Sequence, residues 1–397
     1  MKSVIQRYER ELTDSVIPFW ENYCVDREHG GFLICLDRNG DPYDTTKHLW
    51  MQWRTVYMFA ALAETRFAAD RRERWLEIAK QGFRFLVDHG RDPEGAYYFA
   101  LNREGEPIVA PYSSGSDFFA IMGCTALFEA TGDPECREAA IASLESLLGR
   151  TGNPKGRWNK RLAASTQWRA HDTYMATVNL GLVLGEGLGL PGLDDQVDAA
   201  IDTILERFWR EEHGVVLENL DPSFTPDLGS PEGRTVCPGH GLESAWFILQ
   251  HAEKNKRPDR VEKVCEIVKS ILEHAWDPEF GGIYYFTDLL GKPPPELTWD
   301  MKLWWVHCEA LVALLTGYRL TRDASLLEWF EKLDEWTWKH FPDRDHGEWF
   351  GYLNRRGEPT HMLKGGTWKT FFHLPRALLE CIGQMEQLSA GSAHPDS

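Results

Sequence analysis

A short motif recurs along this chain at a nearly constant interval, and this repetition constrains the fold more than any other feature of the sequence. Each copy has an acidic turn, a glycine, an apolar or aromatic run and, in most copies, a second turn. The leading glycines of five copies lie 65, 119, 67 and 66 residues apart: Gly30, Gly95, Gly214, Gly281 and Gly347. Because 119 is close to two ordinary steps, we expect a sixth, degenerate copy near residues 152–158. The chain of 397 residues therefore holds six units.

Two helical patterns separate successive copies, judged by apolar residues three and four positions apart. The first helix of each pair is expected at residues 4–24, 72–90, 133–150, 193–210, 257–276 and 324–341. The second helix is expected at 45–66, 114–132, 168–187, 238–255, 299–321 and 368–389. The glycine motif that joins the two helices is typical of a short hairpin or turn.

Six helix pairs connected in the same way predict an all-α fold, an (α/α)6 barrel with six inner helices inside an outer ring of six. An open solenoid is the alternative, but solenoid ends need distinct polar caps, and both terminal units are as apolar as the central ones. We expect one domain over residues 1–390 and a disordered tail at 391–397. Since every hairpin precedes an inner helix, the hairpins and the inner N-termini should share one end, which we expect to carry the active site.

The charge balance excludes some functions. The chain has 61 acidic and 43 basic residues, a formal charge of −18, and no basic stripe, so nucleic-acid binding is disfavoured. No apolar run approaches the roughly 18 residues of a membrane span, and the first twenty residues are charged throughout. We therefore expect a soluble, cytoplasmic protein without a membrane partner. Its eight cysteines show no C-x-x-C pair and are expected to be buried thiols.

Tryptophan is abundant, and several copies fall in or beside the expected inner helices. Packing in the core accounts for many tryptophans in any protein. Flat aromatic faces beside polar groups also suit sugar rings, whose faces are apolar and whose edges carry hydroxyl groups. The residues concerned are Trp50, Trp53, Trp168, Trp246, Trp304, Trp305 and Trp368.

Two histidines are the strongest candidates for chemistry. His240 and His373 each lie within the first turn or two of an expected inner helix, in a polar patch of an otherwise apolar segment. Imidazole has a pKa of about 6.5, so near neutral pH one ring can accept a proton while the other donates one. The pair therefore predicts a two-base proton-transfer site. His171 and His307 also lie on inner helices, and for them a structural role is as well supported as a functional one.

Further polar residues on the inner helices are expected around this pair. Glu243 follows His240 by three residues and is predicted to orient it and raise its basicity. Arg54 stands in an otherwise apolar helix, and its permanent charge suits an oxyanion that builds up during a reaction. Lys302, Trp305 and Glu309 share one face by the i, i+3, i+7 rule and are expected to bind substrate. Trp368 and His171 complete the predicted substrate site.

Two other classes of function stay open. A glycoside hydrolase would use paired carboxylates, for which Asp117, Glu243, Asp300 and Glu309 are candidates, but hydrolysis does not require two histidines. A binding protein without catalysis is a further alternative. A metal site is not expected, because the sequence has no H-E-x-x-H motif and no close cluster of His and Asp.

At these residues the sequence resembles the N-acylglucosamine 2-epimerase family, whose relatives include cellobiose 2-epimerases and other aldose epimerases and isomerases. The resemblance runs along nearly the whole chain and is densest at residues 16–21, 90–101, 238–247, 299–309, 347–358 and 364–373. It implies an (α/α)6 barrel, commonly dimeric, that inverts C2 of a free aldose. The resemblance implies that His240 and His373 match the histidine pair of the family. It likewise implies that Arg54, Glu243 and Glu309 resemble the polar residues around that pair.

One segment departs from the family pattern. In N-acylglucosamine epimerases, the segment before the third inner helix resembles a Gly-Lys-rich loop that is linked to a nucleotide effector. Here residues 153–161 keep a basic beginning, but Gln167–His171 differ. A histidine on this helix is closer to enzymes of unmodified sugars. We expect interconversion of N-acyl-D-glucosamine and N-acyl-D-mannosamine without a cofactor, with ATP as a candidate allosteric effector. An epimerase or aldose–ketose isomerase of unmodified sugars is the alternative.

Overall fold

The protein is described by a computed structural model that covers residues 2–150, 153, 155–160, 162, 165, 167–188 and 193–391. The inner helices are α3 (Leu49–Ala63), α5 (Gly115–Thr131), α7 (His171–Gly187), α10 (Pro238–Lys254), α12 (Trp304–Thr321) and α14 (His373–Gly391). The outer helices are α1 (Lys2–Arg10) with η1 (Glu11–Val16) and α2 (Ile17–Tyr23), α4 (Arg72–His89), α6 (Pro134–Gly149), α8 (Asp194–Thr203) with η3 (Ile204–Phe208), α11 (Pro258–Ala275) and α13 (Ala324–His340). The predicted alternation of helix pairs is confirmed.

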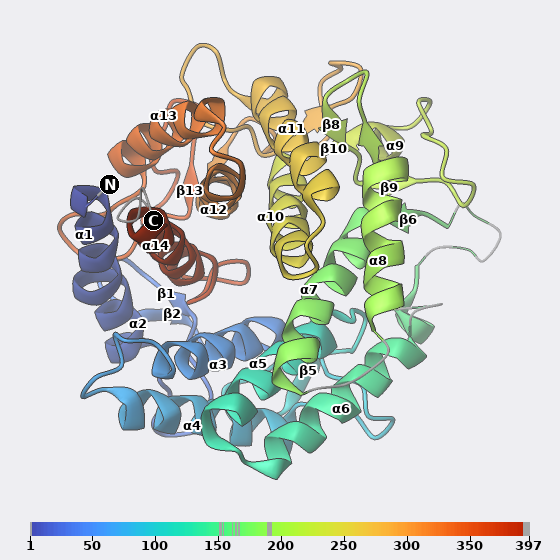
Figure 1. The fold of residues 1–397 in the computed structure, drawn as a ribbon. Coiled ribbons are helices and arrows are strands. Elements are labelled where there is room, and N and C mark those ends of the chain that lie inside the picture. Colours follow the sequence, from blue (N-terminus) through green and yellow to red (C-terminus); the bar gives the residue numbers. More distant parts are fainter. Residues whose placement is uncertain are drawn as a thin grey trace.

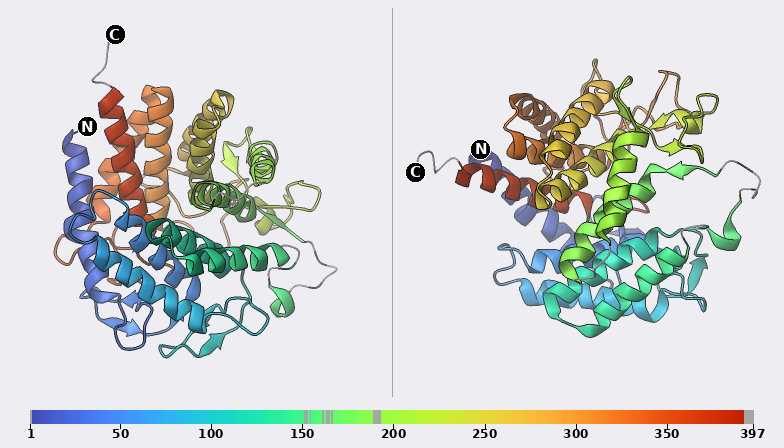
Figure 2. Two further views of the ribbon diagram at one scale, coloured as in Figure 1. Left: turned by 60° about the horizontal axis from the view of Figure 1, so that its bottom comes forward. Right: turned by 45° about the vertical axis from the view of Figure 1, so that its right-hand side comes forward.

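The helices form two concentric rings. Consecutive inner helices pack against each other from α3 to α14. Each of the outer helices α4, α6, α8, α11 and α13 packs on the inner helix that directly precedes it in the chain. The chain passes once around the ring from blue to red (Figure 1), and the blue helix α1 lies beside the red helix α14 in both views of Figure 2. The first helix, α1, packs directly on the last, α14. This is the closed barrel that the repeat predicted, and not an open solenoid.

Short antiparallel strands connect neighbouring units. Three pairs are hairpins within a unit: β1 (Cys35–Leu36) with β2 (Pro42–Asp44), β4 (Ala100–Leu101) with β5 (Pro107–Val109), and β7 (Trp209–Arg210) with β8 (Val215–Val216). In the other four pairs, the strand before an inner helix pairs with the motif of the following unit. These pairs are β3 (Lys47–His48) with β4, β6 (Arg169–Ala170) with β9 (Asn219–Leu220), β10 (Thr235–Val236) with β11 (Thr287–Asp288), and β12 (Lys302–Leu303) with β13 (Tyr352–Leu353). The predicted hairpins are thus in large part strands shared between units.

This pairing explains where the sequence boundaries were wrong. The inner helices expected from residues 45, 168, 299 and 368 begin at Leu49, His171, Trp304 and His373. The preceding residues look helical by apolar spacing, but β3, β6 and β12 take up their backbone hydrogen bonds. Before α14, the chain forms a loop that contains the isolated bridge between Gly366 and Lys369.

A buried ion-pair set joins units in three places. The acidic residue that opens the glycine motif contacts a lysine from the segment before the same unit's inner helix and an arginine from the motif of the next unit. The nitrogen–oxygen distances are 2.7 to 3.2 Å. The three sets are Asp26 with Lys47 and Arg103, Asp277 with Lys302 and Arg355, and Asp343 with Lys364 and Arg38. The third set connects the last unit to the first, so it closes the ring.

Local signals define the helix ends. Gly132 ends α5 with a φ of +69°, a left-handed conformation that glycine adopts without strain. Asp133 then caps α6 by accepting a hydrogen bond from the backbone N–H of Glu135, and Pro134 occupies the first helical position. Two residues thus reverse the chain from an inner to an outer helix.

Some predictions from the sequence concern residues outside the described ranges. Part of the degenerate copy expected at residues 152–158 and the residues after 391 lie outside the described ranges, so the copy and the tail stay predictions. Gly391 itself belongs to α14. Over the described ranges, none of the helices combines the length and the apolar character that crossing a bilayer requires.

Candidate active site

The first turns of the inner helices bring the predicted site residues together. His171 is the first residue of α7, His373 is the first of α14, and His240 is the third of α10. Trp305 is the second residue of α12, and Arg54 is the sixth of α3. Because the inner helices are neighbours in the barrel, their first turns bring together residues that are distant in the sequence.

His373 is held by a buried carboxylate. Its Nδ1 lies 2.7 Å from Oε1 of Glu309, which is 1% exposed. Glu309 also accepts hydrogen bonds from the guanidinium of Arg376 and the indole N–H of Trp246, each at 2.7 Å. A carboxylate with these donors accepts the Nδ1 proton, so Nε2 of His373 keeps its lone pair. This nitrogen faces Nη1 of Arg54 at 3.4 Å.

The surroundings of His373 favour the neutral ring. Burial disfavours the imidazolium, and the positive charges of Arg54 and Arg376 act in the same direction, so the pKa of His373 falls well below its usual value of 6.5. The charge of Glu243 opposes this shift without overcoming it. At neutral pH, His373 is therefore uncharged, and the lone pair of its Nε2 can accept the contact from Arg54.

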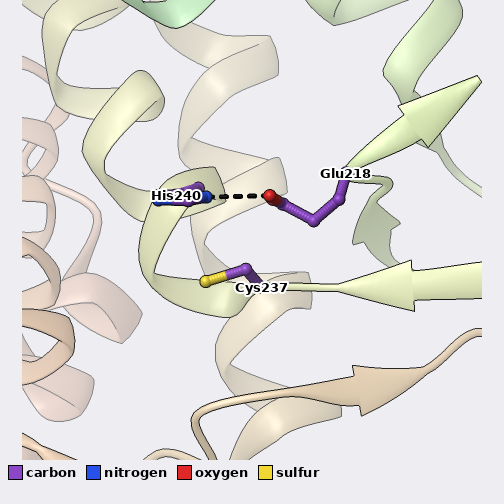
Figure 3. Close-up of side chains that lie close together, drawn as sticks. All are labelled: Glu218, Cys237 and His240. Carbon is purple, nitrogen blue, oxygen red and sulfur yellow. Dashed lines mark hydrogen bonds and ion pairs between the residues drawn. The ribbon is translucent and has the colours of Figure 1, made fainter. Parts of the chain in front are cut away.

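His240 has the opposite environment. Its Nδ1 lies 2.9 Å from Oε2 of Glu218, which comes from the connection between β8 and β9 (Figure 3). Burial disfavours the charged ring, but the negative charge of Glu218 outweighs it and raises the pKa of His240 well above 6.5. Burial likewise opposes ionisation of Glu218, and the charge of His240 overcomes it to lower the pKa of Glu218 to about 2. His240 is therefore protonated at neutral pH.

The prediction that Glu243 orients His240 is wrong. Glu243 accepts a hydrogen bond from Nη2 of Arg376 at 2.7 Å, and the same nitrogen bonds Glu309. The spacing of three residues places His240 and Glu243 on one helix face, but Glu243 lies one turn deeper and points toward α14. The partner of His240 is Glu218, which belongs to another segment of the chain.

Sequence reasoning missed Glu218 and Arg376. Arg376 follows His373 by three residues on α14, so the rule applied to His240 and Glu243 could have identified it. Glu218 lies in a connection without helical periodicity, and no local pattern distinguishes it from the other acidic residues of the motifs.

Trp305 contacts both histidines. Its ring centroid is 5.3 Å from that of His240 and 5.6 Å from that of His373. A side chain at Gly239 would place its Cβ 2.6 Å from the Trp305 ring, so only glycine permits this close approach of α10 to α12. One indole therefore contacts both imidazoles, and the charge of His240 also contributes to the lowered pKa of His373.

Arg54 has an aromatic surround. Its guanidinium carbon lies 4.6 Å from the ring centroid of Trp50, 4.0 Å from that of Phe119 and 4.7 Å from that of Phe372. Burial lowers the pKa of Arg54 to about 9, so it remains a cation at neutral pH. Trp368 packs edge-on against Trp50 at 5.2 Å but is 61% exposed, in the loop before α14.

Lys302 does not join this site, and its assignment to substrate binding is wrong. It lies in β12, before the helix begins, and its fully buried amine contacts Asp277 at 3.2 Å. Lys47 makes the same contact with Asp26 in the first unit. Lys302 is therefore part of the repeated structural ion pair. The i, i+3, i+7 rule failed because it assumed a helix from residue 299, five residues before the helix begins at Trp304.

The remaining candidates divide between structure and site. His307 is buried, accepts a hydrogen bond from the backbone N–H of Ile283 at Nε2 and donates from Nδ1 to the carbonyl of Leu303, so its role is structural. His171 is also buried, but its ring nitrogens have no hydrogen-bond partner within the part of the chain that is described. Its Nδ1 lies 3.8 Å from Oε1 of Glu218, which places it beside His240.

The carboxylates do not form the pair that a glycosidase needs. Asp117 contacts Arg150 at 2.8 Å. Glu243 and Glu309 both accept a hydrogen bond from Nη2 of Arg376. A glycosidase needs one carboxyl that donates a proton, whereas both of these carboxylates are bound to one guanidinium, so this arrangement does not support hydrolysis.

The sequence is similar to known sugar epimerases. A family model described as N-acylglucosamine 2-epimerase (GlcNAc 2-epimerase) matches residues 30–377. The chain belongs to the N-acylglucosamine 2-epimerase family. The mouse (Mus musculus) N-acylglucosamine 2-epimerase is 36% identical over 382 residues, which cover 95% of this chain and 90% of the relative. Cellobiose 2-epimerase of Bacteroides fragilis is 26% identical over 403 residues, covering 96% and 98%.

A solved structure supports the fold independently. The cellobiose 2-epimerase from Bacillus thermoamylovorans superposes with a TM-score of 0.81 over 97% of this chain and 100% of its own, at 19% identity. This similarity confirms the (α/α)6 barrel predicted from the sequence.

Proposed function

We propose that this enzyme is a sugar 2-epimerase that interconverts N-acyl-D-glucosamine and N-acyl-D-mannosamine by proton transfer at C2. The observation that carries the proposal is a pair of imidazoles that both contact Trp305 and whose surroundings shift their pKa values in opposite directions. Similarity to the mouse N-acylglucosamine 2-epimerase supports the substrate class.

The reaction begins with the ring-opened aldose, in which the C1 aldehyde acidifies the proton on C2. Neutral His373 takes this proton at Nε2, and the electrons move onto the carbonyl to form an enediolate. Arg54, 3.4 Å from that nitrogen, is placed to stabilise the negative charge on O1. Protonated His240 then returns a proton to the opposite face of C2. The carbonyl is the electron sink, so the chemistry needs no redox cofactor.

The carboxylates prepare the two rings for opposite tasks. Glu309 accepts from Nδ1 of His373 and stabilises the imidazolium that forms there, while Arg376 holds Glu309 in position. Glu218 keeps His240 charged and ready to donate. After turnover the two rings have exchanged protonation states, so exchange with solvent or the reverse reaction restores the starting state.

Turnover in D2O tests this proposal. The epimerised product should carry one deuterium at C2, detected by mass spectrometry and by loss of the C2 proton signal in NMR. Epimerised product without solvent deuterium would indicate hydride transfer and refute the two-histidine route. Release of a reducing end from oligosaccharides, without epimerisation, would instead support the hydrolase.

A second candidate is an epimerase or aldose–ketose isomerase of unmodified sugars. It is favoured by His171 at the start of α7, where the sequence departs from the N-acylglucosamine enzymes. Proton return to C1 in place of C2 would give a ketose. Incubation with N-acetylglucosamine, mannose, glucose and cellobiose, followed by chromatography, distinguishes the candidates by which substrate is converted and to what product.

Assembly and regulation complete the proposal. We propose a homodimer in the cytoplasm, with ATP as an allosteric effector through the basic segment 153–161, two residues of which lie outside the described ranges. A mass twice that of the 45.6 kDa chain in light scattering would support the dimer. An initial rate unaffected by added ATP would refute the nucleotide effect.

A further inference from the structure

We propose that Glu218, Cys237 and His240 form a binding site for a soft divalent cation such as Zn²⁺, and that the bound cation switches the enzyme off. The binding half of this proposal rests on the geometry alone. The inhibitory half rests on the catalytic role proposed above for His240.

Two segments of the chain bring the three ligand atoms together. Cys237 is the N-cap residue of α10, and the sequence Cys-Pro-Gly-His places His240 on the first turn of the same helix (Figure 3). Glu218 reaches this turn from the connection between β8 and β9. One nitrogen, one sulfur and one oxygen lie within 4.8 Å of one another. Around a tetrahedral zinc ion, ligand atoms are about 3.3 to 3.8 Å apart, so small side-chain adjustments suffice.

The donor set selects the type of cation. Thiolate and imidazole together suit zinc and its soft neighbours, whereas calcium and magnesium prefer oxygen ligands. The thiol of Cys237 makes no capping hydrogen bond to the helix and interacts with the ring of His240, so its sulfur already lies beside another ligand atom of the proposed site.

His171 is a second, independent sign of a ligand at this place. Its ring is completely buried, and neither nitrogen has a hydrogen-bond partner in the described portion of the chain. Buried polar groups normally have partners. Nδ1 of His171 lies 3.8 Å from Oε1 of Glu218, the oxygen that does not bond His240. A small movement of this ring would supply a fourth ligand.

A second group of ligand atoms shows why this one is distinctive. Glu243, Glu309 and His373 are equally close to one another. There, however, the guanidinium of Arg376 already contacts both carboxylates at 2.7 Å. Glu218 contacts only histidine side chains among the ion pairs of the described residues. In the first cluster the partner of the carboxylate is a histidine, whose proton a cation can replace, whereas the second cluster already holds the permanent charge of Arg376.

Metal binding would stop proton transfer by His240. The ion takes the lone pair of Nδ1, which holds a proton beside Glu218 when the metal is absent. Nε2 then keeps its own proton, so the ring can neither accept a proton there nor cycle through the imidazolium. The bound cation takes the place of the proton on Nδ1 of His240, and it stays bound during turnover.

The test uses Co²⁺ as a spectroscopic probe and Zn²⁺ as an inhibitor of the full-length enzyme. Wild type should bind one Co²⁺ with a near-ultraviolet sulfur-to-cobalt absorption band. Cys237→Ala should lose this band and bind Co²⁺ at least tenfold more weakly. Cys308→Ala, which removes another buried thiol on an inner helix, is the matched control and should keep the band. No band in wild type, or an unchanged band in Cys237→Ala, would overturn the site.

Activity separates the two halves of the proposal. Without metal, Cys237→Ala should keep wild-type turnover, and it should need at least tenfold more Zn²⁺ for half inhibition. EDTA should restore the inhibited wild type. A cobalt band without loss of activity would leave the site standing and refute the catalytic role of His240. Equal zinc inhibition of wild type and Cys237→Ala would overturn the site while the epimerase proposal stands.

Discussion

Arg38 and Asp343 are 305 positions apart in the chain and form a two-point ion pair, with nitrogen–oxygen distances of 2.7 and 2.9 Å. Lys364 contacts the same carboxylate at 2.8 Å from a completely buried position. Burial opposes ionisation of Asp343, but the hydrogen bonds from Arg38 and Lys364 overcome it and hold its pKa well below the usual range. The contact joins the first unit to the last and closes the barrel.

Asp343→Asn should destabilise the protein strongly, because it leaves Lys364 buried without its counter-charge. Breaking such a buried pair costs about 3 to 5 kcal/mol, measurable as a fall in the free energy of unfolding in guanidinium chloride. Asp92→Asn is the matched control. Asp92 opens the motif of the second unit, where it accepts backbone hydrogen bonds from Glu94 and Ala96. Equal losses in the two variants would contradict a special role in ring closure.

Lys302→Met should lower stability and leave catalysis intact, because Lys302 pairs with Asp277 and does not reach the histidines. We expect a loss of about 3 to 5 kcal/mol, with kcat and KM within about twofold of wild type at a temperature where the variant is folded. Lys47→Met changes the same position of the first unit and should behave alike. A raised KM in Lys302→Met alone would restore Lys302 to the substrate site.

His240→Asn and His373→Asn should each lower kcat by about 10²- to 10⁴-fold, the range of general acid–base catalysis. Circular dichroism should show unchanged helix content in both. His29→Asn, at a motif turn, is the control and should retain wild-type turnover. If either active-site variant is fully active, that residue does not transfer the proton.

Glu218→Gln should move the alkaline limb of the pH profile of kcat/KM to lower pH, in the direction in which His240 donates. The donor must be protonated, so activity is lost as pH rises through the pKa of His240, which the charge of Glu218 raises. The acid limb depends on neutral His373, whose pKa lies well below 6.5, and should stay in place. The exposed Glu232→Gln should leave both limbs unchanged; a matching shift there, or an unmoved alkaline limb in Glu218→Gln, would refute this pairing.

Gly239→Ala should impair catalysis by displacing Trp305 from its contacts with the two imidazoles, because the added Cβ would meet the indole at 2.6 Å. Overpacking of this kind also costs about 1 to 3 kcal/mol of stability. Gly383→Ala lies on α14 with nothing within 4 Å of the new Cβ, so its activity should be unchanged. Intact turnover in Gly239→Ala would show that the position of Trp305 does not matter for proton transfer.

Periodicity predicted much of this molecule. The spacing of the glycine motifs gave six units and the closed barrel, since a repeated helix pair has few ways to bury its apolar faces. The family and its epimerase reaction class, recognised from segments such as residues 238–247, are confirmed by the comparisons. The catalytic roles of His240 and His373 stay predictions, although the barrel brings both rings to one tryptophan.

The amino-acid order alone determined the helix pairs, the ring and the helix turns on which the two histidines lie, because these depend on spacing within one segment. Only the tertiary structure decided that His240 pairs with Glu218, that Arg376 bridges Glu243 and Glu309, and that Lys302 belongs to a structural ion pair. Each of these contacts joins different segments of the chain. The packing of neighbouring units therefore decides which charged residues pair, and a local sequence pattern cannot predict this packing.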